Sequence, residues 1–263
     1  MSTGILHKMN VRLGDQVDYQ LELDELVRMN ELVGSELKLS WTGQIFCSAC
    51  GKLTKKSFGD GFCYPCFANA PQAAPCIIRP ELCRAHVGEG RDPEWEMRNH
   101  NVPHVVYLAA SDIVKVGITR GDQVPTRWID QGASSAIRLA ETPNRYEAGI
   151  LEVALKDFFA DKTNWQRMLK NEIDEQIDLV EEKWNLHDQL PGDLNTYFSE
   201  NDEVTEIHYP VLQFPNKVKS LSFDKAYEVR AKLMGIKGQY LIFEGGDVLN
   251  IRKHTGYKVA LEF

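Results

Sequence analysis

Two pairs of cysteines constrain the fold more than any other feature of this sequence. Cys47 and Cys50 form one Cys-x-x-Cys pair, and after twelve intervening residues Cys63 and Cys66 form another. A turn of this kind lets two thiolates bind one tetrahedral zinc ion at about 2.3 Å, and two such turns complete a shell of four sulfur ligands. Two unrelated pairs of free thiols are the alternative interpretation. The spacing favours the zinc site, which would hold residues 47–66 in one compact module.

A zinc ion with four cysteine ligands has no open position for water, so this ion should be structural and should stabilise the folded state. The pattern resembles those of zinc ribbons and treble clefs. Three lysines, Lys52, Lys55 and Lys56, lie between the two pairs. They could contact phosphates or could remain solvated at the surface, and the sequence does not separate these two interpretations.

The two remaining cysteines, Cys76 and Cys83, could form a second zinc site. Histidines follow at His86, His100 and His104, and imidazole is a common zinc ligand. The two cysteines and two of these histidines would provide four ligands. Because the spacing is irregular, buried thiols and ordinary histidines are the alternative. The sequence therefore predicts one structural zinc ion and allows a second.

The composition is that of a globular protein with more than one structural unit. With 263 residues the chain can bury a sizeable core, and its 43% hydrophobic and 26% charged residues are ordinary values. No apolar run approaches the ~20 residues needed to cross a bilayer, and residues 1–4 lack the basic and apolar regions of a signal peptide. We therefore expect a cytoplasmic protein without membrane contact, in which cysteines bind metal rather than form disulfides.

The formal net charge of −8 is distributed unevenly. Residues 171–206 contain twelve acidic residues and one lysine, a net −11, whereas residues 104–170 sum to +1 and residues 207–263 to +4. A protein can bind phosphates through a local basic patch while a distant face stays acidic. The balance excludes a broadly basic protein that coats DNA without regard to sequence, but it allows a local nucleic-acid site.

Both ends of the chain show patterns of short β-strands. Residues 19–23 and 37–41 alternate between apolar and polar near the N-terminus, and residues 237–243 and 248–251 flank a Gly-Gly-Asp turn near the C-terminus. We expect the two ends to meet in one β-rich unit.

An amphipathic helix is predicted over residues 165–187. Its apolar stripe contains Leu169, Ile173, Ile177, Val180 and Trp184. The acidic residues lie on the other face, which is most simply a solvated surface but could also contact a protein partner. Pro191-Gly192 should end the element.

The segment from His104 to Trp165 carries most of the functional information. Residues 105–109 and 115–119 are apolar runs on either side of a polar turn at Ser111-Asp112, which predicts a β-hairpin. Pro125 suits the first turn of a helix. A tyrosine, an arginine and a glutamate then follow on three successive predicted elements.

This segment resembles the GIY-YIG nuclease family over residues 104–165. Val105-Val106-Tyr107 stands where the family has GIY, and Lys115-Val116-Gly117 stands where it has YIG, so that Lys115 replaces the second tyrosine. Arg127 would lie on the first helix, and the run Tyr146-Glu147-Ala148-Gly149-Ile150-Leu151-Glu152 is similar to the signature of the second helix. Asn164 occupies a position where family members often carry asparagine. The candidate catalytic residues are therefore Tyr107, Lys115, Gly117, Arg127, Glu152 and Asn164.

The resemblance implies hydrolysis of a phosphodiester. Glu152 would bind one Mg²⁺ or Mn²⁺, a hard ion that prefers carboxylate oxygen, and Arg127 would contact a non-bridging phosphate oxygen through its planar fork. Tyr107 would orient or deprotonate the attacking water, and Gly117 would let the backbone pass close to the substrate. Lys115 could act in place of the phenol, or it could mark a domain that binds nucleic acid without cutting it.

The wider arrangement of a zinc module before a nuclease-like domain resembles an uncharacterised bacterial family of unknown function. The sequence therefore predicts an α+β fold, with a GIY-YIG-like small antiparallel sheet flanked by helices, a zinc-ribbon or treble-clef module and a β-rich unit formed by the chain ends. The expected segments are a β-rich N-terminal segment over 1–45, a zinc module over 46–103, the GIY-YIG-like domain over 104–170, an acidic helix and connection over 171–206, and a β-rich C-terminal segment over 207–263.

Three functions are compatible with these features. The first is a metal-dependent endonuclease, with DNA favoured over RNA as substrate and with the zinc module assisting binding. The second is a non-catalytic nucleic-acid-binding or regulatory protein on the same fold. The third is a protein-interaction scaffold, which the acidic segment slightly favours. Glu152 favours catalysis, whereas Lys115 weakens the case for it.

Overall fold

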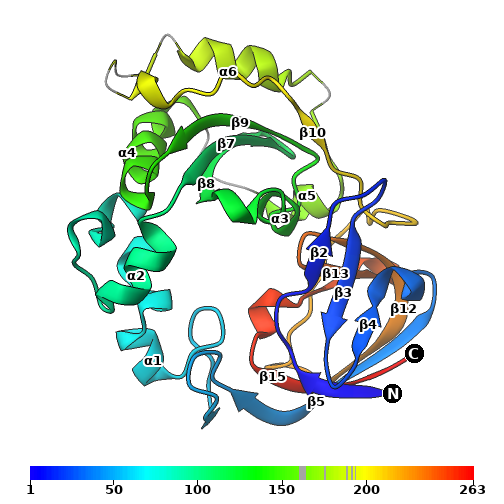
Figure 1. The fold of residues 1–263 in the computed structure, drawn as a ribbon. Helices are drawn as coiled ribbons and strands as arrows, with labels where there is room; N and C mark the ends of the chain where they lie inside the picture. The colour runs from blue at the N-terminus through cyan, green and yellow to red at the C-terminus, as the bar shows by residue number, and fades with distance from the viewer. Residues whose placement is uncertain (160–163, 175, 188, 191, 193) are drawn as a thin grey trace.

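The computed structural model describes residues 1–159, 164–174, 176–187, 189–190, 192 and 194–263. Within this part of the chain, strands form three β-sheets that are joined by short helices (Figure 1). The first and last strands pair with each other, so both termini lie in the same β-rich unit. The fold is mixed α+β with several sheets, as the sequence predicts.

The largest sheet contains strands from both ends of the chain. Its spatial order is β1 (Ser2–Ile5), β15 (Tyr257–Glu262), β5 (Glu36–Phe46), β12 (Glu228–Lys237), β13 (Tyr240–Phe243), β14 (Asp247–Asn250) and β11 (Lys219–Ser220), and β6 (Leu53–Thr54) pairs with β5. These strands pair in antiparallel fashion except for β11 and β14, which are parallel. Leu37 and Leu39 of β5 are buried, because alternate residues of a strand point to the same face.

A three-stranded antiparallel sheet shares a hydrophobic core with the largest sheet. It consists of β2 (Asn10–Arg12), β3 (Asp18–Glu22) and β4 (Leu26–Arg28). Tyr19 and Leu21 of β3 are buried and face the shared core. The alternation predicted for residues 19–23 and 37–41 therefore corresponds to strands in both cases.

The third sheet has four antiparallel strands, in the order β10 (Thr205–Glu206), β9 (Ser135–Thr142), β7 (His104–Ala110) and β8 (Val114–Arg120). Strands β7 and β8 form the predicted hairpin, in which Tyr107 lies opposite Gly117. Helix α3 (Thr126–Asp130) connects β8 to β9, and helix α4 (Arg145–Leu155) follows β9.

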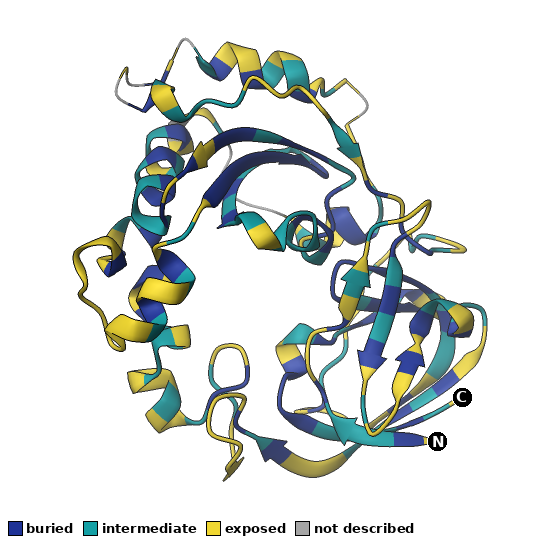
Figure 2. Ribbon diagram, in the orientation of Figure 1, coloured by how far each residue is buried: buried dark blue, intermediate teal, exposed yellow. Residues whose placement is uncertain are grey.

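Strand β7 is buried along its whole length, because both faces of the sheet are covered (Figure 2). Tyr107 and Ala109 face a large hydrophobic core that is continuous with the β-rich unit. Val106 and Leu108 face a second core, which includes residues of α4 and of α6 (Leu179–His187). A strand that is covered on both faces is expected to be apolar along its length, as residues 105–110 of β7 are.

The prediction of a single helix over residues 165–187 is wrong. The chain instead forms α5 (Trp165–Leu169) and α6, and the described residues between them, 170–174 and 176–178, are not helical. Asn171 has a φ of 57°, a left-handed conformation that asparagine tolerates and that ends a helix. Asp178 then begins α6 by accepting hydrogen bonds from the N–H groups of Val180 and Glu181. The predicted stop at Pro191 lies outside the described residues.

The segment between β6 and β7 consists mainly of short helical turns. It contains α1 (Tyr64–Asn69), α2 (Pro93–His100) and the 3-10 turns η3 (Pro75–Ile77) and η4 (Pro80–Leu82). Helix α4 crosses η4 at Gly149, which is buried. A Cβ atom at Gly149 would overlap the backbone of Pro80 and Glu81, so the missing side chain lets the helix approach this segment.

Gly149→Ala tests this crossing. Alanine should improve helix propensity by up to about 1 kcal/mol, but overlap with rigid backbone costs about 1–3 kcal/mol. We therefore expect a net loss of stability in urea denaturation. The matched control is Val153→Ala on the same helix, where the side chain is 41% exposed and a change within about 0.5 kcal/mol is expected. A Gly149→Ala protein as stable as wild type would contradict the close crossing.

Candidate functional site

The first zinc group lies between β5 and α1. Cys47 directly follows β5, Cys63 directly precedes α1, and Cys66 lies within that helix. The Sγ atoms of these residues and Cys50 all lie within 4.8 Å of one another, so the four could hold a zinc ion. Burial alone would raise the pKa of the Cys47 thiol. Hydrogen bonds from backbone N–H groups, of which that of Cys63 has the largest effect, outweigh burial and lower this pKa. The thiolate form that zinc binds is therefore favoured at Cys47, whereas hydrogen bonds with Cys63 and Cys50 raise the pKa of Cys66.

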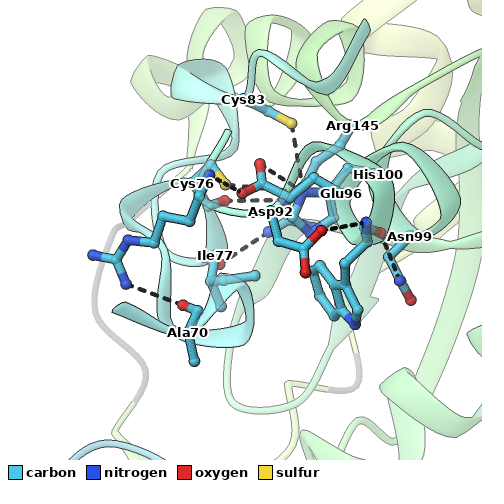
Figure 3. A network of polar contacts seen from close by, with 11 residues as sticks. Ala70, Cys76, Ile77, Cys83, Asp92, Glu96, Asn99, His100 and Arg145 are labelled. Carbon is cyan, nitrogen blue, oxygen red and sulfur yellow. Dashed lines mark hydrogen bonds and ion pairs between the residues drawn. The ribbon is translucent and has the colours of Figure 1, made fainter. Parts of the chain in front are cut away.

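A second group of metal-binding side chains consists of Cys76, Cys83, Glu96 and His100. All four residues are buried. The His100 Nδ1 atom lies 3.9 Å from Cys76 Sγ, 3.7 Å from Cys83 Sγ and 3.8 Å from a carboxylate oxygen of Glu96 (Figure 3). These four side chains could also hold a zinc ion.

The second group differs from the predicted set of two cysteines and two histidines. His86 stacks on an aromatic ring of α4, with centroids 4.5 Å apart. His104 Nδ1 lies 2.7 Å from a backbone carbonyl oxygen, and burial lowers the pKa of His104 to about 4. Glu96, which the sequence analysis missed, takes the place of one histidine. The signal for it was the four-residue spacing from His100, which puts both side chains on one face of a helix.

A cleft of about 470 Å³ lies where the zinc segments, the four-stranded sheet and the β-rich unit meet. The edge strand β8 contributes Gly117, and helices α3 and α4 contribute Arg127, Arg145 and Glu152. Arg252, from the turn before β15, lines the same cleft. The residues that complete the wall from the zinc segments are Gly59, Asp60, Phe62, Gln72, Ala73, Ala74, Ile77, Ile78 and Pro80.

A second hollow of about 400 Å³ adjoins this cleft and extends its basic lining. Arg127, Arg145 and Arg252 line both hollows, and Arg120 lines the second. The described part of this region therefore has four arginines, although the whole chain is acidic. Such a local concentration of positive charge attracts anions in spite of the net charge.

Tyr107 lies beside the cleft and is almost completely buried. Its hydroxyl donates a hydrogen bond of 2.7 Å to Oε1 of Gln131, which lines the cleft. Burial raises the pKa of Tyr107 to about 12, and the nearby Arg127 opposes this rise. The phenol is therefore neutral near pH 7 and acts as a hydrogen-bond donor. A Cβ atom at Gly117 would lie only 2.7 Å from the phenol oxygen, which explains why glycine fits opposite this ring.

Glu152 is a partly buried carboxylate among positive charges. Burial raises the pKa of Glu152, and the charges of Lys156, Arg145 and Arg127 only partly offset this rise, to which the carboxylate of Glu81 adds. The carboxylate and the two guanidinium groups all line the cleft and therefore act on one another there. A carboxylate in this setting can bind a divalent cation, and the guanidinium groups can bind phosphate oxygens.

Arg145 joins the cleft to the second metal-binding group. Its guanidinium donates hydrogen bonds to the carbonyl oxygens of Cys76 at 3.0 Å and Ile77 at 2.9 Å (Figure 3). Arg145 was not predicted as a site residue, although it directly precedes the run beginning at Tyr146. Arg252 was not predicted either, because nothing in the sequence indicates that the C-terminal segment reaches the cleft.

Three predicted site residues, Tyr107, Lys115 and Asn164, are not among the described residues that line the cleft, although Tyr107 contacts its lining through the hydrogen bond to Gln131. Lys115 lies two residue pairs further along the hairpin than Gly117, about 7 Å away at the rise of a strand. Burial lowers the pKa of Lys115, and Asp112 partly offsets this effect. The Oδ1 atom of Asn164 accepts hydrogen bonds from the N–H groups that begin α5, so this side chain caps a helix. The structure brings Tyr107, Gly117, Arg127 and Glu152 together.

The three lysines of the first zinc segment also lie outside the described lining of the cleft. Lys52, Lys55 and Lys56 are exposed, and Lys56 Nζ lies 5.4 Å from the ring centroid of Phe58. Solvated surface is the simpler interpretation of these side chains.

Gly117→Ala tests the contact between the hairpin and the phenol. The new methyl group should displace Tyr107 and lower the free energy of unfolding by about 1–3 kcal/mol, as overpacking does elsewhere. The control is Gly121→Ala, because a Cβ atom there would meet its nearest neighbour at 3.7 Å. Urea denaturation of both variants checks the prediction. If Gly117→Ala and Gly121→Ala were equally stable, the distance of 2.7 Å between a Cβ atom at position 117 and the phenol oxygen would be contradicted.

Cys47→Ser tests the first zinc group. Loss of one thiolate should remove the zinc ion from this group and lower the melting temperature, because binding energy at a structural zinc site is folding energy. The control is Ser48→Ala, which changes the neighbouring side chain but none of the ligands. Metal analysis of purified protein would refute the assignment if Cys47→Ser kept the zinc content of wild type.

Comparison with known proteins places the chain in a family but gives it no activity. No curated protein and no solved structure shows a significant match. Among the described residues, no helix is both long and apolar enough to cross a membrane. One family profile extends from the turn before β5 into β15 and so includes both metal-binding groups and the whole cleft. The chain belongs to this family, which is described as protein of unknown function (DUF2797) and which matches residues 34–259.

Proposed function

We propose that the cleft binds a phosphodiester of nucleic acid, with DNA favoured over RNA, and hydrolyses it with one Mg²⁺ or Mn²⁺ bound at Glu152. One observation carries the proposal: a partly buried carboxylate lies with Arg127 and Arg145 in an open cleft beside an edge strand. Hydrolysis of a phosphodiester needs a bound cation, a positioned water and positive charges that offset the charge of the transition state. The cleft offers residues of the right chemistry for each.

The order of elements around the cleft supports the same proposal. The chain runs from the β7–β8 hairpin through α3 to β9 and then into α4. This is the order of hairpin, first helix and second helix that the GIY-YIG resemblance implies, with Arg127 on α3 and Glu152 on α4. We take this shared order of elements as support for the proposal at the level of connectivity alone.

The described side chains fit one magnesium or manganese ion. Asp60, the other carboxylate in the described lining, forms a 2.8 Å ion pair with Arg252, so Glu152 is the better ligand. Mg²⁺ usually keeps several of its waters and binds proteins through one or two carboxylates together with substrate phosphates, so Glu152 and a bound phosphate would hold it jointly. When bound, the ion would polarise a phosphate oxygen and offset the negative charge on the leaving oxygen.

Side chains of the protein would bind the phosphate and orient the water. Arg127 and Arg145 would bind non-bridging phosphate oxygens, because a planar guanidinium matches two oxygens at once. Tyr107 is neutral near pH 7 and already donates its one hydroxyl proton to Gln131, so its oxygen would orient a bound water by accepting a hydrogen bond from it rather than act as a base. Gln131 would hold the phenol in place through its 2.7 Å hydrogen bond.

Non-catalytic nucleic-acid binding is the second candidate function. The observation that favours it is Lys115, which replaces the second tyrosine of the motif and is not among the described residues that line the cleft. The four arginines of the two adjoining hollows would still bind a phosphate backbone, with an affinity that falls steeply with salt concentration.

Cleavage by wild type and by Glu152→Gln distinguishes the two functions. Supercoiled plasmid, a branched DNA duplex and single-stranded RNA are incubated in Mg²⁺ and then in Mn²⁺. We expect wild type to cleave at least one substrate and Glu152→Gln to be slower by about 10²-fold or more.

Glu141→Gln is the matched control, because Glu141 is exposed on β9 and pairs with Arg138 away from the cleft. It should cleave like wild type. Equal rates for Glu152→Gln and wild type would reject Glu152 as the metal ligand. Absence of cleavage in either ion, with salt-dependent binding by both proteins, would favour the second candidate.

A further inference from the structure

We infer that Cys76, Cys83, Glu96 and His100 bind a second zinc ion, and that this ion fixes Arg145 in the wall of the cleft. The ligand assignment rests only on these four side chains and their surroundings. The role of Arg145 in binding an anion rests in addition on the proposed function. The four residues come from three separate elements, so the ion would join η3, the residue after η4 and helix α2.

The donor atoms lie close to the arrangement of a closed zinc site. The two sulfur atoms, the imidazole Nδ1 and a carboxylate oxygen all lie within 4.8 Å of one another. Ligands about 2.0–2.3 Å from a tetrahedral ion are themselves about 3.3–3.8 Å apart, and His100 Nδ1 lies 3.7–3.9 Å from the other donors. Only a small contraction would bring them into bonding distance.

Burial favours a metal ion over an empty cluster. Glu96 is 2% exposed and His100 is 4% exposed, and an ionised carboxylate without a compensating cation is costly in such a place. One oxygen of Glu96 accepts a hydrogen bond of 2.8 Å from the N–H of Arg91, which orients the carboxylate. A zinc ion would compensate the charge of the carboxylate and of both thiolates.

Charge balance then gives Arg145 a defined place. Two thiolates and one carboxylate carry three negative charges, and zinc contributes two positive charges, so the centre keeps one negative charge. The guanidinium of Arg145 donates to the carbonyl oxygens of Cys76 and Ile77, directly beside a ligand, and offsets that charge. The zinc centre would therefore hold this arginine through both geometry and charge.

The same arrangement places the metal centre against the cleft. Ile77 lines both adjoining hollows, and His100 lines the second of them. Arg145 lines both hollows as well and lies close enough to Glu152 to act on its charge. Without the ion, the turn containing Cys76 and Ile77 would lose its anchor and Arg145 would lose its fixed acceptors.

The zinc content of the 263-residue protein tests the ligand set. Wild type should contain about two zinc ions per chain, whereas His100→Ala and Cys83→Ser should each contain about one. Glu94→Gln is the control, because Glu94 is exposed on the same helix and should leave both ions in place. About one ion in wild type, lost on Cys47→Ser, would overturn the inference, and so would an unchanged content in His100→Ala.

Two further variants keep the test decisive if His100→Ala fails to fold. His100→Cys replaces one zinc ligand by another, so it should keep two ions and, after cobalt substitution, show stronger sulfur-to-metal charge-transfer absorption than wild type. Glu96→Gln should release its second ion at a chelator concentration at least about tenfold lower than wild type. If His100→Cys shows the charge-transfer absorption of wild type and Glu96→Gln releases its second ion at the same chelator concentration as wild type, these residues are not zinc ligands.

The positioning of Arg145 by the zinc ion can be measured without a cleavage assay. The Nε–H resonance of Arg145, assigned by its loss in Arg145→Lys, should exchange slowly with solvent in the two-zinc protein and at least about tenfold faster in His100→Ala. Equal exchange in both would reject the positioning role. If zinc content and exchange behave as expected but no nucleic acid is cleaved, the inference stands and the nuclease proposal fails.

Discussion

The hydrogen bonds from Arg145 to the carbonyl oxygens of Cys76 and Ile77 connect the two halves of the cleft. Helix α4 carries Arg145 at its first position and Glu152 two turns later. Because Gly149 lies between them and lets α4 contact the turn at Pro80, the helix approaches the zinc segment along its length. The position of the carboxylate relative to the opposite wall therefore depends on this one crossing.

Metal binding would compensate for the small core of that wall. The hydrophobic cluster around the second metal-binding group consists of Ala74, Cys76, Cys83 and Ala85, with Tyr146 packed against it. Burial of such small side chains contributes little free energy, since the hydrophobic effect is proportional to buried apolar area. A segment of this kind is stable where metal ligation supplies folding energy. The four-stranded sheet, by contrast, has a large core on each face.

Local patterns predicted the elements but not how they come together. The alternation at residues 19–23, the polar turn after Ala110 and the Cys-x-x-Cys pairs each depend on neighbouring residues, and the corresponding strands, hairpin and cysteine cluster are present. The approach of Arg252 to Asp60 joins residues far apart in the chain, so no local pattern encodes it. The helix predicted over 165–187 failed because Asn171 adopts a left-handed conformation that an apolar stripe does not reveal.

The central claim is that Glu152 holds a divalent cation in a cleft where Arg127 and Arg145 bind phosphate. Crystals grown with Mn²⁺ and a non-hydrolysable phosphorothioate dinucleotide would test it most directly, because manganese scatters anomalously and is distinguishable from zinc at its own absorption edge. The account predicts a manganese peak bound to the Glu152 carboxylate, with a phosphorothioate group contacting both guanidiniums. A manganese peak elsewhere with none at Glu152, or a dinucleotide bound away from this cleft, would contradict the account.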